Sequence, residues 1–563
     1  MLEDPMKRGF KTFAAFALAA ALSSVPLFAS GVADRPTMHK IASYESGEYN
    51  VDGGVMEIIA YNKANGYAYS VNGQSGVLTA IDLTVLEGNG TDIDLEGVDI
   101  DVKTLVEGVD PSFSYGDMTS VSVSPDGALL ALALQAEAYN AAGRIAIFEC
   151  GGDGTISLLS LVECGVQPDM IVFADDDTVL TANEGEPREG YGEGLDDPAG
   201  SVTIVDISSM QPVTVGFEAF DSDDARDELV SRNVIIMKDR LPSADFEPEY
   251  IAVAGDRAYV TLQEANAIAV LDIPSADFVD IYSAGFEDYS KTPVDIDKKD
   301  DAYNPATYAS LRGIRMPDGI AAFSVDGTSY LVTANEGDAR EWGDEDDGTF
   351  YISEDERDFG DGQSSPTGLI TAEDSGLDGK VVFFASGDFD GLDEGLDYIF
   401  GGRSFTIYEV CDDGLKEVAT SGDDFEALTA QLYPEFYNSS NDNAVLDDRS
   451  GKKGPEAESV TVGVVDGRAY AFTALERTGG VMMYDVTTPV SPVYVDYINT
   501  RDFRSVVEGS QEYDDGELDK WVSGGDVAPE GLSFVPAADS PTSNALLLVA
   551  NEVSGTVAVY GIY

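Results

Sequence analysis

The chain has a single histidine among its 563 residues, His39, close to the N-terminus. Nucleophilic systems of the Ser-His-Asp or Cys-His type need a histidine base beside the nucleophile, so this count excludes them from the body of the chain. It also excludes histidine-ligated zinc and copper sites. There is no P-loop, and the glycine-rich stretches are acidic with no helix predicted after them. A nucleotide or dinucleotide site is therefore not supported.

Cysteine is also scarce, with Cys150, Cys164 and Cys411 as the three copies. Three cysteines and one histidine cannot complete a closed Cys/His zinc site. Cys150 and Cys164 are spaced so that they could pair at the ends of adjacent strands in an oxidising compartment. Three buried thiols fit the sequence equally well, and both alternatives stay open.

Basic residues are also scarce. The chain has 32 Lys and Arg residues against 104 Asp and Glu residues, which gives a net charge of −72. Such a chain repels nucleic acid and anionic lipid, which excludes both as partners. It attracts cations. The acidity can serve solubility or a salty medium, and it can also supply oxygen ligands for a divalent cation, for which we expect Ca²⁺.

The N-terminus has the pattern of an exported protein. After an upstream extension come the basic residues Lys7, Arg8 and Lys11, then residues 13–28, which are mostly apolar, and residues 29–33, which are mostly small. This order predicts a signal peptide within residues 1–33 and a secreted or periplasmic protein. The alternative is a membrane anchor, for which the apolar run is short. No later stretch reaches the length of a membrane span, and no anchoring tail is detected, so we expect no membrane insertion after cleavage.

The feature that the sequence has in abundance is an internal repeat. Each unit has a short apolar strand, a polar turn with Gly or Asp, a second apolar strand that often ends in an Asn-Glu or Gln-Glu pair, and a last strand of the form VxVxD. The seven units span residues 56–83, 119–150, 168–207, 248–273, 317–410, 457–486 and 529–562. Strands that cannot bury both faces alone stack against their neighbours, and a closed stack leaves few exposed edges. The units predict an all-β, seven-bladed β-propeller over residues 44–563.

The runner-up fold, an open β-solenoid, fits less well because long insertions make the units unequal. The insertions are rich in Asp, Glu, Gly and Ser, and we expect acidic loops there that build up one face of the disc. They fall at about residues 221–247, 275–315, 341–401, 412–456 and 500–527.

Several units resemble a known family. The stretches that carry the resemblance include QPDMIVFADDDTVLTANEGEP, MPDGIAAF, YLVTANEGDARE, KKGPEAESVTVGVVDGRAYAFTALERTGG and VAPEGLSFVPAADSP. They are similar to the choice-of-anchor I proteins, and the similarity covers about residues 44–563. The resemblance implies a secreted or surface-attached propeller, in a family where some members are labelled alkaline phosphatase-like or surface glycoproteins. This chain departs from the family in carrying no anchoring tail or sortase-type signal.

An acidic residue recurs at the start of the first strand in six of the seven units, and only Ser120 breaks the row. The six are Glu57, Asp169, Glu249, Asp318, Glu458 and Glu530. The first strand of each blade lines the channel of a propeller, so equivalent positions share one ring. Six carboxylates on a ring repel unless a cation or shared protons compensate. We predict a divalent cation site at the channel mouth; the alternative is that these carboxylates cap backbone amides or pair with arginines.

A second row follows the second strand. Its members are Asn183, Glu184, Glu264, Asn335, Glu336, Glu476, Asn551 and Glu552. Their oxygens suit calcium or magnesium, and a hydrogen-bonded clasp between blades is an equally good interpretation. Arg188, Arg340 and Arg477 follow three members and would neutralise the row or bind an anion.

Acidic clusters in the insertions are further, weaker calcium candidates. None has the full spacing of an EF-hand loop. They are Asp344 to Asp347, then Asp388, Asp390, Asp393 and Asp397, and finally Asp442, Asp447 and Asp448.

These observations favour a non-catalytic, monomeric binding or surface-assembly protein that uses calcium and takes a small molecule, a glycan or a surface protein as ligand. The first alternative is a calcium-dependent phosphohydrolase similar to phytase-type propellers, in which cations bind phosphate and activate water. The second is a carbohydrate-active enzyme that uses paired carboxylates. It needs an aromatic cleft, for which Trp342 and Trp521 are the candidates.

Overall fold

The computed structural model describes residues 35–563, apart from residues 74, 89, 192–193, 298, 345–347 and 504–523. The predicted signal peptide lies outside the described residues. So do Glu345, Asp346, Asp347 and Trp521 of the predicted candidates. The compact unit analysed below is Thr37–Tyr563.

Within the described residues, seven sheets contain four or more strands each, and all their strand pairs are antiparallel except that of β1 with β5; we number these sheets in chain order. The strands of sheet 1 are β2 (Ile59–Asn62), β3 (Tyr67–Asn72), β4 (Val77–Asp82) and β6 (Gly97–Asp101). The strands of sheet 2 are β7 (Tyr115–Val123), β8 (Leu129–Ala136), β9 (Ala142–Cys150) and β10 (Ile156–Val166). The strands of sheet 3 are β11 (Pro168–Phe173), β12 (Thr178–Asn183), β13 (Ser201–Asp206) and β14 (Gln211–Gly216). The strands of sheet 4 are β16 (Pro248–Ala254), β17 (Arg257–Leu262), β18 (Ala267–Asp272) and β19 (Asp277–Ser283).

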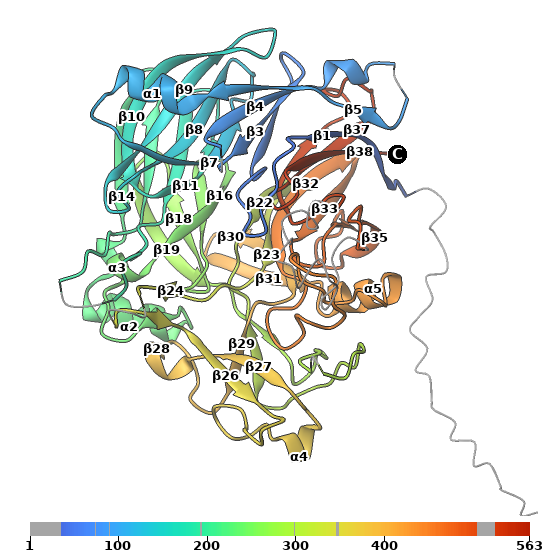
Figure 1. The fold of residues 1–563 in the computed structure, drawn as a ribbon. Coiled ribbons are helices and arrows are strands. Elements are labelled where there is room, and N and C mark those ends of the chain that lie inside the picture. The colour runs from blue at the N-terminus through green and yellow to red at the C-terminus, as the bar shows by residue number, and fades with distance from the viewer. Residues whose placement is uncertain are drawn as a thin grey trace, which may run out of the picture. The chain divides into compact units, whose positions relative to one another are not determined.

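The remaining sheets are built in the same way (Figure 1). The strands of sheet 5 are β22 (Ile320–Val325), β23 (Thr328–Asn335), β30 (Ser404–Cys411) and β31 (Gly414–Thr420). The strands of sheet 6 are β32 (Ala457–Val465), β33 (Arg468–Leu475), β34 (Val481–Asp485) and β35 (Val493–Ile498). The strands of sheet 7 are β36 (Pro529–Val535), β37 (Ala545–Asn551), β38 (Thr556–Ile562), β1 (Met38–Glu45) and β5 (Ile93–Asp94).

Strand β1 joins the two ends of the described chain, because it pairs antiparallel with β38 and continues the last sheet. Its residues precede the first repeat unit, so the repeat did not predict its place. Residue pairs such as Tyr44 with Val557 fix the register. The N-terminal segment therefore completes a sheet whose other long strands come from the C-terminus.

The first strands of the seven sheets contact one another in a cycle. β2 contacts β7, and the contacts continue through β11, β16, β22, β32 and β36 back to β2. Apolar side chains fill the space between each pair of neighbouring sheets. Between sheets 7 and 1, for example, Leu548 and Val559 pack in one cluster with Ile59 and Ile81. Burial of apolar surface between sheets is thus the main stabilising contribution.

Local sequence explains why each sheet is a meander of short strands. In sheet 4, RAYVTL and AIAVLD are rich in β-branched and aromatic residues, which favour strands. The turn between them places Asn266 at a φ of 50°, and its amide donates to the carbonyl of Gln263 at 2.9 Å. Asparagine tolerates this left-handed conformation, so the turn closes a tight hairpin.

The insertions carry structure of their own (Figure 1, where β26, β27, β29 and α4 lie below the sheets). Their strands are β15 (Ile236–Met237), β20 (Phe286–Asp288), β21 (Leu311–Ile314), β24 (Glu341–Trp342), β25 (Tyr351–Ile352), β26 (Glu354–Asp358), β27 (Lys380–Phe384), β28 (Phe389–Asp390) and β29 (Asp397–Phe400). The α-helices among the described residues are α1 (Val102–Val109), α2 (Asp223–Ser231), α3 (Pro242–Asp245), α4 (Ala372–Ser375) and α5 (Asp424–Leu432). Buried residues such as Leu311, Phe383 and Ile399 form a separate apolar cluster.

Two further features bear on the sequence analysis. The three cysteines are free thiols, so Cys150 and Cys164 are not bridged in this structure. Within the described part of the chain, none of the helices combines the length and the apolar character needed to cross a lipid bilayer.

Candidate functional site

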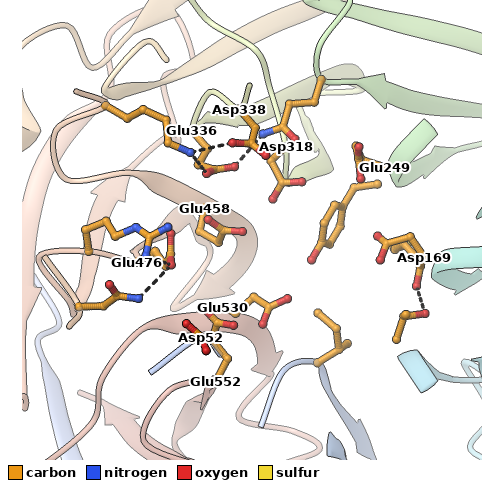
Figure 2. A pocket seen from close by; sticks show the side chains of 18 of the residues that line it. Asp52, Asp169, Glu249, Asp318, Glu336, Asp338, Glu458, Glu476, Glu530 and Glu552 are labelled. Carbon is orange, nitrogen blue, oxygen red and sulfur yellow. Dashed lines mark hydrogen bonds and ion pairs between the residues drawn. The ribbon is translucent and has the colours of Figure 1, made fainter. Parts of the chain in front are cut away.

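A polar cavity of about 630 Å³ lies where the first strands of the sheets meet. Figure 2 shows carboxylates from both predicted rows facing this space. The acidic residues that line it are Asp52, Asp169, Glu249, Asp318, Glu336, Asp338, Asp442, Glu458, Glu476, Glu530 and Glu552. Of the first row, only Glu57 is not part of the lining.

A repeated irregularity of the first strand directs the first-row carboxylates. In sheet 3, Pro168 pairs with Asn183 but Ile171 pairs with Thr181, so the register shifts across Asp169. The same shift spans Glu249 in β16, Glu458 in β32 and Glu530 in β36. A β-bulge re-aims the side chain at its position, so the bulge turns each acidic residue towards the cavity.

The residue two positions before each first-row carboxylate connects the two rows through a backbone hydrogen bond. It has a positive φ in four sheets, at Gln167, Met316, Glu456 and Ala528. In three of these sheets its carbonyl accepts a hydrogen bond from the amide of a second-row glutamate: Glu184 at 3.0 Å, Glu476 at 2.9 Å and Glu552 at 2.9 Å. None of the four is glycine, so the sequence carried no signal for this turn.

The first row is under strong electrostatic strain. Burial, and then repulsion by neighbouring carboxylates, raises the pKa values of Glu249, Asp318, Glu458 and Glu530 well above their usual range. The pKa of Glu57 is also raised well above its usual range, first by burial and then by the charges of Asp117 and Glu552. Burial raises the pKa of Asp169 to about 7.

Three oxygens of this row have no hydrogen-bond partner although they are buried: Asp318 Oδ2, Glu458 Oε2 and Glu530 Oε2. Asp318 is only 6% exposed. An unpaired buried acceptor costs about 1–3 kcal/mol, and more when it is charged. The three oxygens therefore need a proton or a cation.

Carboxylates from the two rows form compact groups in which one oxygen of each residue lies within 4.8 Å of the others. One group contains Asp169, Glu184 and Glu249, and a second contains Asp318, Glu336 and Glu458. Three oxygens at this separation can share one divalent cation, since calcium takes ligands at about 2.3–2.6 Å. Each group joins neighbouring sheets, so a bound cation would link them.

The asparagines of the second row have a different position. Asn183, Asn335 and Asn551 are fully buried, and each donates from Nδ2 to the third strand of its own sheet. Asn335 Nδ2 reaches Ser404 Oγ at 3.0 Å and Thr406 Oγ1 at 2.8 Å, while its Oδ1 accepts from Thr333 Oγ1 at 2.9 Å. These contacts lie within one sheet and do not cross between sheets.

Replacing Asn335 by alanine should therefore destabilise the fold and leave cation binding intact. We expect a loss of about 1–3 kcal/mol in the free energy of unfolding, because the partner hydroxyls lose their bonds in a buried site. Urea unfolding and calcium titration measure the two quantities. The matched control is Asn544→Ala, an exposed position. Lost calcium binding with unchanged stability would identify Asn335 as a ligand instead.

The glutamates of the second row face the cavity or lie beside it. Burial raises the pKa of Glu336 to about 7 and that of Glu552 to about 8. Glu264 does not line the cavity; its Oε2 is buried without a partner, and burial raises its pKa to about 8. Glu184 is 9% exposed and belongs to the group around Asp169.

Two of the three predicted arginines lie away from the cavity lining. Arg188 is exposed and pairs with Glu186 at 3.0 Å. Arg340 is buried, where it pairs with Glu247 at 3.2 Å and donates to the backbone carbonyl of Asp245 at 2.9 Å. These bonds engage the Arg340 guanidinium inside the protein, so it is not placed to meet a ligand from the cavity.

Arg477 does line the cavity, as part of a cluster that the sequence did not reveal. Glu456 is fully buried and pairs with Arg449, with Lys453 at 3.2 Å and with Arg477 at 3.1 Å. Despite its burial, these three cations hold the pKa of Glu456 well below its usual range. Lys453 also reaches Glu336 at 3.0 Å. The cluster supplies positive charge at one side of an otherwise acidic cavity.

Sheet 2 supplies a carboxylate that the repeat alignment missed. Ser120 occupies the position where other sheets have a first-row carboxylate, and it is uncharged. Asp117 lies three residues earlier in β7. Its charge helps to raise the pKa values of Glu57 and Asp169, and burial raises its own pKa. One register shift in β7 precedes Asp117 and a second separates it from Ser120, which explains why the repeat alignment failed here.

Of the acidic clusters in the insertions, Asp442 lines the cavity. Asp390 pairs with Arg226 at 2.9 Å, and Asp397 accepts from Thr367 and Ser310. Those two carboxylates already have partners within the protein.

The sheets and the cavity define an all-β, propeller-like protein with an acidic centre. The sequence matches the choice-of-anchor I domain over residues 57–489, and the chain belongs to this family. The resemblance predicted from the repeat units is thereby confirmed. Family membership supports a surface protein.

Two curated relatives share 28% identity with the chain. One is Gigasin-3a of Magallana gigas, matched over 168 residues, which are 29% of this chain and 56% of that protein. The other is a mesenchyme-specific cell surface glycoprotein of Strongylocentrotus purpuratus, matched over 286 residues, which are 45% of this chain and 36% of that protein. The chain thus spans about half or less of the length of these relatives.

Among solved structures, similar chains include the β-propeller domain of Cps50 (Swd1) from Myceliophteria thermophila, with 9% identity and a TM-score of 0.41. The match covers 93% of this chain and 100% of that one. The periplasmic gluconolactonase PpgL of Pseudomonas aeruginosa has 10% identity and a TM-score of 0.39 over 90% of this chain and 98% of that one.

Proposed function

We propose that the chain is a secreted or surface seven-bladed β-propeller that binds divalent cations in its central cavity and uses the loaded cavity to bind a ligand. The support for seven blades is the cycle of contacts among the first strands, together with an apolar cluster between every pair of neighbouring sheets. The apolar segment within residues 1–33 remains our candidate for the export signal.

One observation carries the cation proposal. Asp318 Oδ2, Glu458 Oε2 and Glu530 Oε2 are buried without partners and belong to neighbouring sheets on the wall of one cavity. A cation between such oxygens removes their repulsion and satisfies their lone pairs. Carboxylates are hard oxygen ligands, which favour calcium or magnesium over softer metals.

A cation bound in the cavity would also provide coordination positions for a ligand. Calcium takes six to eight oxygen ligands, and a group of three carboxylates leaves positions for a ligand's own oxygens. Tyr250 and Asn441 add a hydroxyl and an amide to the wall. A carboxylate or hydroxyl-rich group of a glycan or a surface protein fits this chemistry. The name of the sea urchin relative, a cell surface glycoprotein, is in line with such a role.

The test compares thermal unfolding and calorimetric calcium titration of protein stripped with EDTA. We expect calcium to bind and to raise the unfolding temperature, with a stabilisation of about 3 kcal/mol when free calcium is 100-fold above Kd. Magnesium is the matched comparison for ion size. If neither cation alters the melting curve or produces binding heat, the proposal is wrong.

A second candidate, metal-dependent hydrolysis of phosphate esters, has one observation in its favour. Lys453 and Arg477 line the same cavity as the carboxylate groups, so positive side chains and cations could together hold a phosphate. Hydrolysis of a phosphomonoester by the calcium-loaded protein tests it. Calcium-dependent stabilisation without hydrolysis would support the binding function and contradict the hydrolase function.

A further inference from the structure

A second acidic cluster lies outside the central cavity, where two insertion segments meet. One segment contains Asp295, Asp297 and Asp300, and the other contains Asp447. Arg403 bridges the segments, because its guanidinium donates to the backbone carbonyl of Asp295 at 2.7 Å and to that of Ser450 at 2.8 Å. These acidic residues do not belong to the cavity lining.

Two side chains at this junction have an unused oxygen. Asp447 is fully buried; its Oδ1 accepts from Ser450 Oγ, and its Oδ2 has no partner. Asn438 is also fully buried; its Nδ2 donates to Ser450 Oγ and Glu426 Oε1, each at 2.9 Å, and its Oδ1 has no partner. Ser450 Oγ thus contacts both side chains, and each of the two retains one buried oxygen without a partner.

The charge at this junction is uncompensated. Burial, and then repulsion by Asp295, Asp300 and Asp297, raises the pKa of Asp447 to about 8. Arg403 does not neutralise Asp447, because its guanidinium is engaged by Glu426 at 2.7 Å and by backbone carbonyls. A buried carboxylate with acidic neighbours and a vacant oxygen is costly unless a cation or a proton binds there.

The backbone holds both side chains in place. Asn438 and Asp447 have positive φ values of 45° and 67°, which Asn and Asp adopt more readily than other residues that have a Cβ. The amide of Asp447 donates to the carbonyl of Tyr437 at 2.8 Å, and the amide of Arg449 donates to that of Asn438 at 2.8 Å. These bonds close the segment around the two oxygens.

We propose that Asp447 Oδ2 and Asn438 Oδ1 bind a divalent cation of the calcium class, at a site separate from the central cavity. The neighbouring aspartates at 295–300 supply the negative potential that attracts it. Bound there, the cation neutralises the buried charge of Asp447 and stabilises the segment 437–450. This site does not depend on the cation site proposed for the central cavity.

The first test counts calcium ions bound per chain by equilibrium dialysis. Asp447→Asn should bind one calcium ion fewer than the unmodified protein. The matched control is Asp301→Asn, which removes an exposed charge from the insertion that contains Asp295 and should retain the full number. If Asp447→Asn binds as many ions as the control, the proposal is wrong and Asp447 is instead protonated.

A second measurement needs no substitution at this junction. In the variant Asp169→Asn/Asp318→Asn/Glu458→Gln, which removes ligands from both carboxylate groups of the central cavity, hydrogen exchange is compared in EDTA and in calcium. We expect calcium at 100-fold above Kd to slow exchange across residues 443–448, which do not line the central cavity, by up to about 100-fold. Exchange that is unchanged by calcium in this segment would overturn the proposal, even if Asp447→Asn does not fold.

Discussion

The double substitution Asp318→Asn/Glu458→Gln is expected to abolish calcium binding at the group of Asp318, Glu336 and Glu458 in the central cavity and to stabilise the calcium-free protein. Both residues belong to one group of three carboxylates. Removing two ligands from one cation should weaken binding by about 100-fold or more, since loss of even an outer-shell contact costs 10–100-fold in metal sites. The neutral amides also remove repulsion between buried charges, so the variant should melt at a higher temperature in EDTA than the unmodified protein.

The opposite effect on the calcium-free protein would argue for a structural role. If these carboxylates mainly capped backbone amides, the variant would melt at a lower temperature in EDTA. Asp52→Asn is the matched control, because Asp52 lines the same cavity, is exposed, and is not in either group of three. We expect this control to retain calcium binding with only a small change from reduced charge. Calorimetric titration and thermal unfolding measure both effects.

The second large effect is expected on the pH dependence of stability, which should decrease rather than increase from acidic towards neutral pH. In EDTA, the free energy of unfolding should fall as pH rises from about 5 to about 8. Asp169 and Glu336 have pKa values raised to about 7, and Glu552 to about 8, whereas unfolded Asp and Glu titrate near 3.9 and 4.3. The folded state therefore holds more protons across this window.

The sign follows from proton linkage. A carboxyl whose pKa is raised by folding stabilises the protein fully below its unfolded pKa, and this contribution is lost as pH rises through the folded value. Each extra proton contributes a slope of about 1.4 kcal/mol per pH unit. Glu456, whose pKa is lowered, has the opposite sign and loses its contribution only below about pH 4. The measured window lies above that range.

Calcium should cancel the inverted dependence. A bound cation displaces the protons, so folded and unfolded states hold similar numbers of them and the slope between pH 5 and 8 becomes shallow. Urea unfolding at a series of pH values, with EDTA or with saturating calcium, measures both slopes. Stability that rises with pH in EDTA across this window would contradict the account of the cavity.

The sequence predicted the first-row carboxylates because repetition carries information about position. Equivalent residues of a repeat occupy equivalent places in the fold, so Asp169, Glu249, Asp318, Glu458 and Glu530 all reach one cavity. In four of these units, those of Asp169, Glu249, Glu458 and Glu530, the same short stretch of sequence also forms the β-bulge. Local pattern was therefore sufficient for this part of the site.

Contacts between distant segments could not be predicted in the same way. The partners of Glu456 come from an insertion and from a repeat unit, and no local pattern in the sequence pairs Lys453 with Glu336. Strand β1 joins the last sheet by long-range pairing. Asp117 was hidden because a register shift separates it from Ser120, the residue that occupies the row position. These features depend on tertiary packing.

The interpretation of the insertions as acidic loops was also incomplete. Residues between β19 and β30 form short strands with an apolar cluster of their own, which includes Leu311, Phe383 and Ile399. Their high content of Asp, Glu and Gly concealed apolar residues that are widely spaced in the sequence. Composition therefore identified where the insertions are, and it did not predict their internal structure.

The most direct test of the central claim is an anomalous diffraction measurement on crystals grown with calcium or with terbium in its place. The account predicts an anomalous peak in the cavity, within about 2.3–2.6 Å of carboxylate oxygens of Asp318 and Glu458 for calcium. A cavity without a peak, at a calcium concentration that saturates binding in solution, would contradict the claim that the carboxylate ring is a cation site.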